Sequence, residues 1–317
     1  MKRRSFLAVS ALGVSGTLLI PNNLLAFNRA SEVVRLGGPV YGKYNSPEEW
    51  IQLLRKAGYK AAYCPVEPGA GAEVIRAYRE AAEKNNITIA EVGAWSNPLS
   101  ANSEEAGKAF KKCTDALALA EEINARCAVN ISGSRNPAEW DGPDPLNLTR
   151  ETFDLIVETT RKIIDTVKPS RTFFTLEMMP WMYPDSTQSC LELMKAIGRK
   201  QFAVHLDPVN MVLSPSIYYN TGDLIRDAFK KLGPHIRSVH AKDILIRVTA
   251  PQVQFDEVIP GNGILDYPVL LKEIAKIPEI PLMIEHLNTA EDYKQAAGYI
   301  RKTGKSCGID VSDTVSF

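Results

Sequence analysis

Short apolar runs alternate with amphipathic segments along the chain from residue 33 onward. The apolar runs have the length of buried strands, and the segments between them repeat apolar positions with helical spacing. No antiparallel hairpin signature separates the runs, so the alternation predicts a parallel sheet. The expected strands are 33–40, 59–66, 87–95, 126–133, 171–179, 201–209, 236–244 and 280–287.

The segments between the runs carry helix signals. Residues 46–50, SPEEW, place a serine N-cap before a proline and two acidic residues, which is typical of a helix start. Eight strand–helix pairs predict an α/β fold, a closed (β/α)8 TIM barrel in a single domain. An open doubly wound sheet is the main alternative, but no GxGxxG motif follows the first strand. Further helices are expected at 73–84, 103–123, 149–167, 187–197, 223–232, 267–274 and 289–302.

The length, net charge and cysteine pattern of the chain limit the classes of function that it can have. A chain of 317 residues is long enough for one such barrel. Lys+Arg and Asp+Glu both number 37, so the net charge is zero and sequence-general binding of nucleic acid is disfavoured. The five cysteines have no CxxC spacing and are interpreted as isolated thiols rather than as a disulfide framework or a zinc site.

The N-terminal segment differs from the rest of the chain. Arg3 and Arg4 precede a mildly apolar stretch, residues 7–20, that is too short to predict a membrane span. The twin arginines followed by Ser-Phe-Leu resemble the bacterial signal that exports folded proteins. We therefore expect residues 1–26 to be a signal peptide and residues 27–317 to form the barrel. The mature protein would be periplasmic, with no stable membrane association; an uncleaved anchor is the alternative.

Polar residues stand at the ends of four consecutive expected strands. Strand 171–179 carries Glu177, strand 201–209 carries Asp207, strand 236–244 carries His240 and strand 280–287 carries Glu285. In a barrel of this kind, chemistry takes place at the C-terminal ends of the strands, which meet at one rim. Three carboxylates and one imidazole suit a single divalent cation, Mn²⁺ in the first place, with Mg²⁺, Co²⁺ or Fe²⁺ as alternatives.

The motifs TLEMMP, HLDPVN, SVHAKD and MIEH, with PGNGILDY at 260–267, resemble the xylose-isomerase-like barrel superfamily. That group includes sugar isomerases, ketose 3-epimerases, inosose dehydratases and repair enzymes of the endonuclease IV type. The resemblance implies that Glu177, Asp207, His240 and Glu285 bind the metal. It also implies that Glu177 and Glu285 exchange the substrate proton.

The resemblance implies a metal-dependent sugar isomerase or epimerase that abstracts a proton next to a carbonyl through a metal-stabilised enediolate. Asn210 departs from the pattern, because the ketose epimerases have a histidine three residues after the metal aspartate. Asparagine binds a sugar hydroxyl but cannot carry a proton. Lys242, which matches the HxKD stretch of the dehydratase branch, favours a dehydratase or lyase of keto-sugars or 3-keto-glycosides. Lys242 would stabilise an oxyanion or assist a leaving group; a plain salt bridge is the other interpretation.

The small-molecule carbohydrate would contact a further set of residues near the rim. Aromatic side chains at a barrel mouth stack on sugar faces, although they also pack under loops. His205 lies two residues before Asp207 and one layer deeper, which favours a buried core histidine over a catalytic one. His286 is expected to face the helix layer and His235 the surface. The candidate substrate-binding residues are Asn210, His205, Trp95, Asn130, Trp140 and Trp181.

Two other classes of function stay open at this point. A phosphodiesterase of the endonuclease IV kind needs two or three metals and more histidines than the four present. An exported carbohydrate-binding barrel without catalysis is the non-enzymatic alternative, although paired glutamates around a metal are not needed for binding alone. The oligomeric state is open, and a homo-oligomer is compatible with the sequence.

Overall fold

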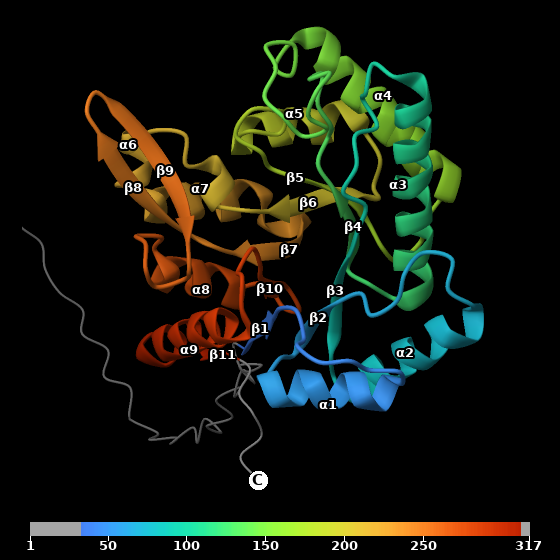
Figure 1. The fold of residues 1–317 in the computed structure, drawn as a ribbon, viewed down its shortest axis with the longest axis vertical. Coiled ribbons are helices and arrows are strands. Elements are labelled where there is room, and N and C mark those ends of the chain that lie inside the picture. The colour runs from blue at the N-terminus through green and yellow to red at the C-terminus, as the bar shows by residue number, and fades with distance from the viewer. Residues whose placement is uncertain (1–32, 312–317) are drawn as a thin grey trace, which may run out of the picture. The chain divides into compact units, whose positions relative to one another are not determined.

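The computed structural model describes residues 33–311; residues 1–32, with the predicted signal segment, and residues 312–317 lie outside the described part. Eight parallel strands close into a barrel in the order β1, β2, β3, β4, β5, β6, β7 and β10, with β10 pairing back onto β1 (Figure 1). The predicted (β/α)8 barrel is therefore confirmed. The barrel strands are β1 Val33–Gly37, β2 Ala61–Tyr63, β3 Thr88–Gly93, β4 Cys127–Asn130, β5 Phe174–Glu177, β6 Phe202–Leu206, β7 Ile236–Ala241 and β10 Pro281–Ile284.

Helices surround the strands, as Figure 1 shows. Ser46 caps the first of them as predicted, with its hydroxyl accepting from the Glu49 backbone N–H. Within residues 33–311, no helix is long and apolar enough to cross a membrane. The helices are α1 Pro47–Ala57, α2 Ala72–Lys84, α3 Ser103–Ile123, α4 Arg150–Val167, α5 Thr187–Ile197, α6 Pro215–Tyr218, α7 Thr221–Leu232, α8 Tyr267–Ala275 and α9 Ala290–Ser306, with short 3₁₀ turns at Val209–Met211 and Gly233–His235.

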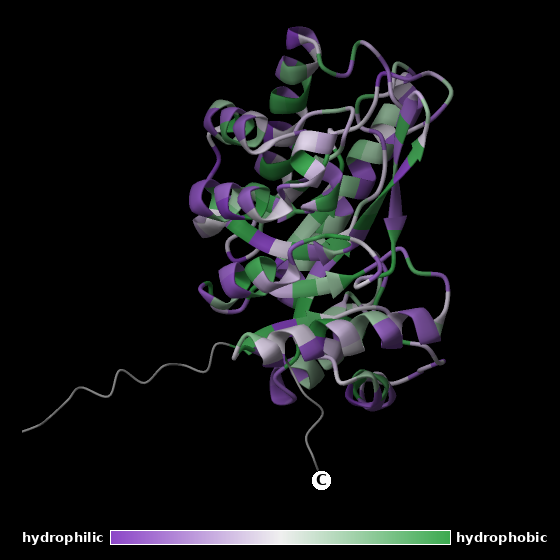
Figure 2. Ribbon diagram, turned by 90° about the vertical axis from the view of Figure 1, so that its left-hand side faces the viewer, coloured by the Kyte–Doolittle hydropathy of each residue, from purple (hydrophilic) through white to green (hydrophobic). Residues whose placement is uncertain are grey.

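The apolar core lies between the strands and the inner faces of the helices. Figure 2 shows helices with green apolar and purple polar stripes, as expected where one face packs on a sheet. Helix α1, for example, buries Trp50, Ile51 and Leu54 while its charged residues face outward. A short strand, β11 (Asp310–Val311), pairs with the N-terminal end of β1. The candidate functional side chains stand at the C-terminal ends of the barrel strands.

The segment after β7 corrects the sequence prediction. The sequence predicts a loop from Arg247 to Gly263, but β8 (Asp243–Thr249) and β9 (Gln252–Val258) form an antiparallel hairpin that projects from the barrel (Figure 1), and only the residues after Val258 are loop. The two strands pair over their whole length, from Asp243 opposite Val258 to Thr249 opposite Gln252. Its turn is made by Ala250 and Pro251, which is not the Asn-Gly type of turn that marks a hairpin in a sequence.

Candidate metal centre and active-site cavity

The four predicted donors converge at one rim of the barrel. Glu177 ends β5, Asp207 follows β6, His240 lies in β7 and Glu285 follows β10. One ligand atom from each lies within 4.8 Å of the others. The imidazole is central: His240 Nδ1 lies 2.9 Å from Glu177 Oε1 and 2.7 Å from Glu285 Oε1. Asp207 Oδ2 is 3.8 Å from the same nitrogen.

Buried oxygens at this cluster lack hydrogen-bond donors. Asp207 and His240 are fully buried and Glu177 is nearly so. Asp207 Oδ1 accepts from the backbone N–H of Val209, but Asp207 Oδ2 and Glu285 Oε1 receive no hydrogen bond. Buried carboxylate oxygens without donors are costly unless a cation compensates them. The donor set of three carboxylates and one imidazole therefore fits a divalent cation, which would act on these oxygens together with the ammonium group of Lys242.

Lys242 brings a positive charge into the same cluster. Its side chain is 2% exposed, and Nζ lies 2.9 Å from Asp207 Oδ2 and 2.8 Å from Glu285 Oε1. Both contacts are ion pairs without hydrogen-bond geometry at the oxygens. A third acid, Glu257 of β9, has its Oε2 3.6 Å from Nζ. The ammonium group is thus at the reacting rim as well as in a salt bridge, so the two interpretations of Lys242 are compatible.

The two glutamates of the cluster lie in different electrostatic surroundings. Burial raises the pKa of Glu177 above its ordinary value, although the neighbouring His240 opposes this. Burial also acts to raise the pKa of Glu285, but His240 and Lys242 outweigh it and lower this pKa to about 2. Carboxyl groups whose environments push their pKa values apart are typical of acid–base sites. The geometry offers one glutamate that stays ionised and one that protonates more readily.

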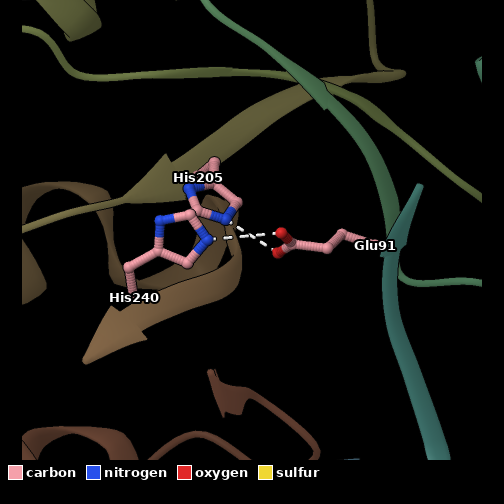
Figure 3. A group of neighbouring side chains, drawn as sticks. All are labelled: Glu91, His205 and His240. Atoms are coloured by element: carbon pink, nitrogen blue, oxygen red, sulfur yellow. Dashed lines mark hydrogen bonds and ion pairs between the residues drawn. The ribbon is translucent and has the colours of Figure 1, made fainter. Parts of the chain in front are cut away.

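A second polar group, which the sequence analysis missed, adjoins the cluster, and its carboxylate residue, Glu91, reaches the cavity wall. Figure 3 shows Glu91 of β3 facing His205 of β6 and His240 of β7. Glu91 Oε2 lies 2.8 Å from His205 Nε2 and Oε1 lies 3.2 Å from His240 Nε2. His205 is fully buried and outside the cavity wall, so the core interpretation describes its position. A signal for Glu91 was present, since it is the one acid in the apolar run 87–95.

A cavity of about 510 Å³ opens above the four donors. Glu177, Glu285, Trp95 and Trp140 line it, so the structure brings two of the predicted tryptophans to the proposed chemistry. Its other walls include apolar and aromatic side chains, among them Tyr63. Of the described residues, the walls hold no lysine or arginine but several acids. The cavity suits an uncharged polar molecule with an apolar face.

Two predicted contact residues are placed elsewhere. Asn130 is fully buried, and its side-chain amide bonds the backbone N–H and C=O of Ser96 at 2.9 and 3.1 Å. It anchors the segment after Trp95 and does not reach the cavity. Trp181 lies outside the cavity wall and donates its Nε1–H to the Asp141 carbonyl at 2.7 Å. That bond supports the loop that carries the neighbouring Trp140.

His286 corrects another expectation, because it lines the cavity instead of facing the helix layer. Its φ of 56° is left-handed, which breaks the alternation of side chains along an extended strand. Strand periodicity therefore misplaces this side chain. Its Nδ1 lies 3.3 Å from Glu257 of the β8–β9 hairpin. His235 is exposed, as expected.

Asn210 lies beside the donor cluster, in the 3₁₀ turn that follows Asp207. Its side-chain amide donates to the Met178 carbonyl at 2.9 Å and lies 3.3 Å from Glu177 Oε1. An amide that donates to a carboxylate orients it without exchanging a proton. The structure thus places Asn210 where it steadies Glu177.

Asp243 organises the rim between the donor cluster and the hairpin. It is 1% exposed, and its carboxylate accepts from the backbone N–H groups of Ile244, Gly261, Gly263 and Leu265. A Cβ at Gly263 would collide with this carboxylate, so glycine is required at position 263 for the close approach.

Replacing Asp243 with Ala is expected to lower the free energy of unfolding by about 2–4 kcal/mol, because four backbone donors lose a charged acceptor. Urea unfolding followed by circular dichroism measures the change. The exposed Asp223, replaced with Ala, is the matched control and should shift it by less than about 0.5 kcal/mol. A loss below about 1 kcal/mol for Asp243→Ala would contradict the role of this carboxylate.

Comparisons with known proteins agree with this architecture. Residues 51–303 match the family described as xylose isomerase-like TIM barrel. D-psicose 3-epimerase from Clostridium cellulolyticum H10, solved with D-tagatose, is 15% identical, covering 87% of this chain and 100% of that chain with a TM-score of 0.62. The probable 3-DHS dehydratase of petrobactin synthesis from Bacillus anthracis is 16% identical, with 85% and 98% covered and a TM-score of 0.62.

A xylose isomerase-like TIM barrel protein from Mycobacterium smegmatis, in complex with magnesium, is 13% identical, with 86% and 97% covered and a TM-score of 0.60. At sequence identities this low, the structural similarity shows a shared fold and nothing more. No curated protein matches the sequence.

Proposed function

Because this chain belongs to the xylose isomerase-like TIM barrel family, we propose that it is a divalent-metal-dependent sugar isomerase or epimerase that moves a proton next to a carbonyl group. One observation carries the proposal: four donors at the ends of β5, β6, β7 and β10 lie within 4.8 Å of one another, and two of them, Glu177 and Glu285, line a cavity. One structural neighbour of this chain is D-psicose 3-epimerase, which by its name inverts a centre of a sugar.

The four donors would hold the cation: Glu177, Asp207, His240 and Glu285. Mn²⁺ is our first choice because a single imidazole joins three carboxylates, with Mg²⁺, Co²⁺ and Fe²⁺ as other candidates. When bound, such an ion acts as a Lewis acid that polarises a carbonyl oxygen. Zero net charge and a total of four histidines disfavour the endonuclease IV kind of chemistry, which needs two or three metals and more histidines.

The chain's own residues supply the proton transfers. Glu285, which lines the cavity, would take the proton from the carbon next to the carbonyl through the carboxylate oxygen that does not face the cation. Glu177, whose pKa is raised, would return a proton from the other side of the cluster. Asn210 would keep Glu177 in place, and Trp95 and Trp140 would stack on the sugar.

A dehydratase or lyase reaction is the second candidate, and the position of Lys242 favours it. Its ammonium nitrogen lies 2.8 Å from Glu285 Oε1, so its positive charge would stabilise an oxyanion that forms beside Glu285 and assist the departure of a leaving group. A neighbour of this chain is named a probable dehydratase. Both reactions begin with the same proton abstraction by Glu285.

The substrate we propose is a neutral sugar or glycoside, because the described cavity walls hold acids and no lysine or arginine. A phosphorylated sugar would meet repulsion there. This choice agrees with export to the periplasm, which we keep as part of the proposal on the twin arginines at Arg3 and Arg4.

Incubation of the Mn²⁺-loaded protein with ketoses and 3-keto-glycosides in D₂O, followed by NMR, tests the function. Deuterium at the carbon next to the carbonyl is expected, with an inverted centre for an epimerase and an unsaturated product for a lyase. Sugar binding with no deuterium incorporation would contradict the proposed enzyme and would instead indicate a carbohydrate-binding barrel without catalysis.

Mn²⁺ is expected to stabilise the protein through the four donors. At 100 times its dissociation constant it should raise the free energy of unfolding by about 2.7 kcal/mol, and thermal unfolding with and without Mn²⁺ measures this. Asp207→Asn should lose most of this increment, whereas the exposed Asp223→Asn should keep it. An equal increment in both variants would place the ion elsewhere.

A further inference from the structure

Glu91 is a buried acid with three hydrogen-bonding neighbours and no place in the proposed proton transfers. It is 2% exposed, and Ser238 of β7 donates its hydroxyl to Glu91 Oε2 at 2.8 Å. The same oxygen faces His205 Nε2, and the other oxygen faces His240 Nε2 (Figure 3). The three neighbours come from two strands across the barrel from β3, and all three are fully buried.

The chemistry of a carboxylate decides which ring nitrogens carry hydrogen. Both oxygens of Glu91 lie within hydrogen-bond distance of donor groups: Oε2 faces the Ser238 hydroxyl and His205 Nε2, and Oε1 faces His240 Nε2. An ionised carboxylate only accepts hydrogen bonds. Nε2 of His240 must therefore carry a hydrogen.

The other nitrogen of the same ring faces two carboxylates of the donor cluster, so it carries a hydrogen until an ion among the donors replaces it. His240 Nδ1 lies 2.9 Å from Glu177 Oε1 and 2.7 Å from Glu285 Oε1. An imidazole binds a metal through a nitrogen lone pair, and the hydrogen bond of its second nitrogen sets which one is free.

We propose that Glu91 is a positioning residue: by accepting the Nε2–H of His240 it leaves Nδ1 as the nitrogen that binds the divalent ion. This rests on the proposed function, since it presumes an ion at Glu177, Asp207, His240 and Glu285. Glu91, His205 and His240 also satisfy the spacing of a second ion site. The Ser238 hydroxyl makes hydrogen bonding the better account, because the carboxylate already has three donors.

Glu91→Gln tests the proposal with an isosteric change. The new amide offers an N–H where the carboxylate offered a lone pair, so one imidazole nitrogen must face it without its hydrogen. We expect the Mn²⁺ dissociation constant, measured by isothermal titration calorimetry, to rise about 10–100-fold. We also expect the His240 ring to lose its uniform Nε2–H state in ¹⁵N NMR of histidine-labelled protein with diamagnetic Mg²⁺.

Ser238→Ala is the matched control, because it removes a donor from Glu91 without touching the His240 contact. Its Mn²⁺ affinity should stay within about threefold of wild type, and its His240 spectrum should be unchanged. Wild type alone also tests the idea and needs no variant to fold: a Mg²⁺-bound His240 with hydrogen on Nδ1 overturns it.

Stoichiometry separates the remaining outcomes. Two Mn²⁺ ions per chain, falling to one in Glu91→Gln, would make Glu91 a ligand and overturn the positioning role. Wild-type affinity and an unchanged His240 spectrum in Glu91→Gln would overturn it as well. If wild type binds no divalent ion at all, both the proposed function and the positioning role fail. If it binds one ion but catalyses no proton exchange, only the proposed function fails.

Discussion

Glu285→Gln is expected to lower the rate of proton exchange at the substrate carbon by about 10²–10⁴-fold, because an amide cannot take up the proton. The change keeps the size of the side chain and one oxygen that can face the cation. Most of the bound Mn²⁺ should therefore remain, although its affinity falls. Deuterium incorporation at saturating Mn²⁺, followed by NMR, measures the rate, and titration calorimetry measures the ion.

The control for this variant is Glu291→Gln, the same change on an exposed acid at the start of α9. It should leave both rate and ion binding at wild-type values. Wild-type exchange in Glu285→Gln would remove Glu285 as the base. Loss of the ion together with the rate would reduce Glu285 to a ligand.

Lys242→Met is expected to lower the free energy of unfolding by about 3–5 kcal/mol in the absence of divalent ions. The substitution leaves Asp207 and Glu285 buried without the ammonium that lies within 2.9 Å of both. A divalent ion among the donors replaces part of the lost positive charge, so saturating Mn²⁺ should shrink the difference between variant and wild type. Urea unfolding with EDTA and with Mn²⁺ measures both values.

The pH dependence of this loss has a definite sign. Burial opposes the charge of Lys242, but Asp207 and Glu285 outweigh burial and raise its pKa. A raised pKa contributes stability that is complete below the unfolded value of about 10.4 and is lost only as the pH rises above it. The Lys242 contribution should therefore be the same at pH 7 and pH 8.

Lys294→Met provides the comparison, since Lys294 forms an exposed pair with Glu291. It should change the free energy of unfolding by less than about 0.5 kcal/mol. A Lys242→Met variant that loses less than about 1 kcal/mol, or the same amount with and without Mn²⁺, would contradict a shared charge site.

The donor cluster was predictable because two periodic rules act together. Alternation of apolar runs and helices implies parallel strands, and parallel strands in a barrel end at one rim. Glu177, Asp207, His240 and Glu285 each stand at such an end, so their convergence followed from position alone. Lys242 was singled out by its place two residues beyond His240 and by its match to the HxKD stretch of the dehydratase branch.

The hairpin and two side-chain directions were not predictable in the same way. Apolar and polar residues are mixed along β8 and β9. Their turn of Ala250 and Pro251 has no strong hairpin signature, so the segment was predicted to be a loop. His286 turns into the cavity because its backbone is left-handed, and Asn130 turns toward Ser96. The directions of these two side chains do not follow from strand periodicity. They depend on local backbone angles and on neighbouring residues from other parts of the chain.

By itself the sequence determined the barrel, the rim and the four donors, because strand and helix periods are local properties of the chain. Only the tertiary structure decided which side chains complete the site. Glu91 and His240 are 149 residues apart and meet across the barrel interior. A contact of that kind depends on barrel closure and on the depth at which each side chain lies, and no local pattern encodes either.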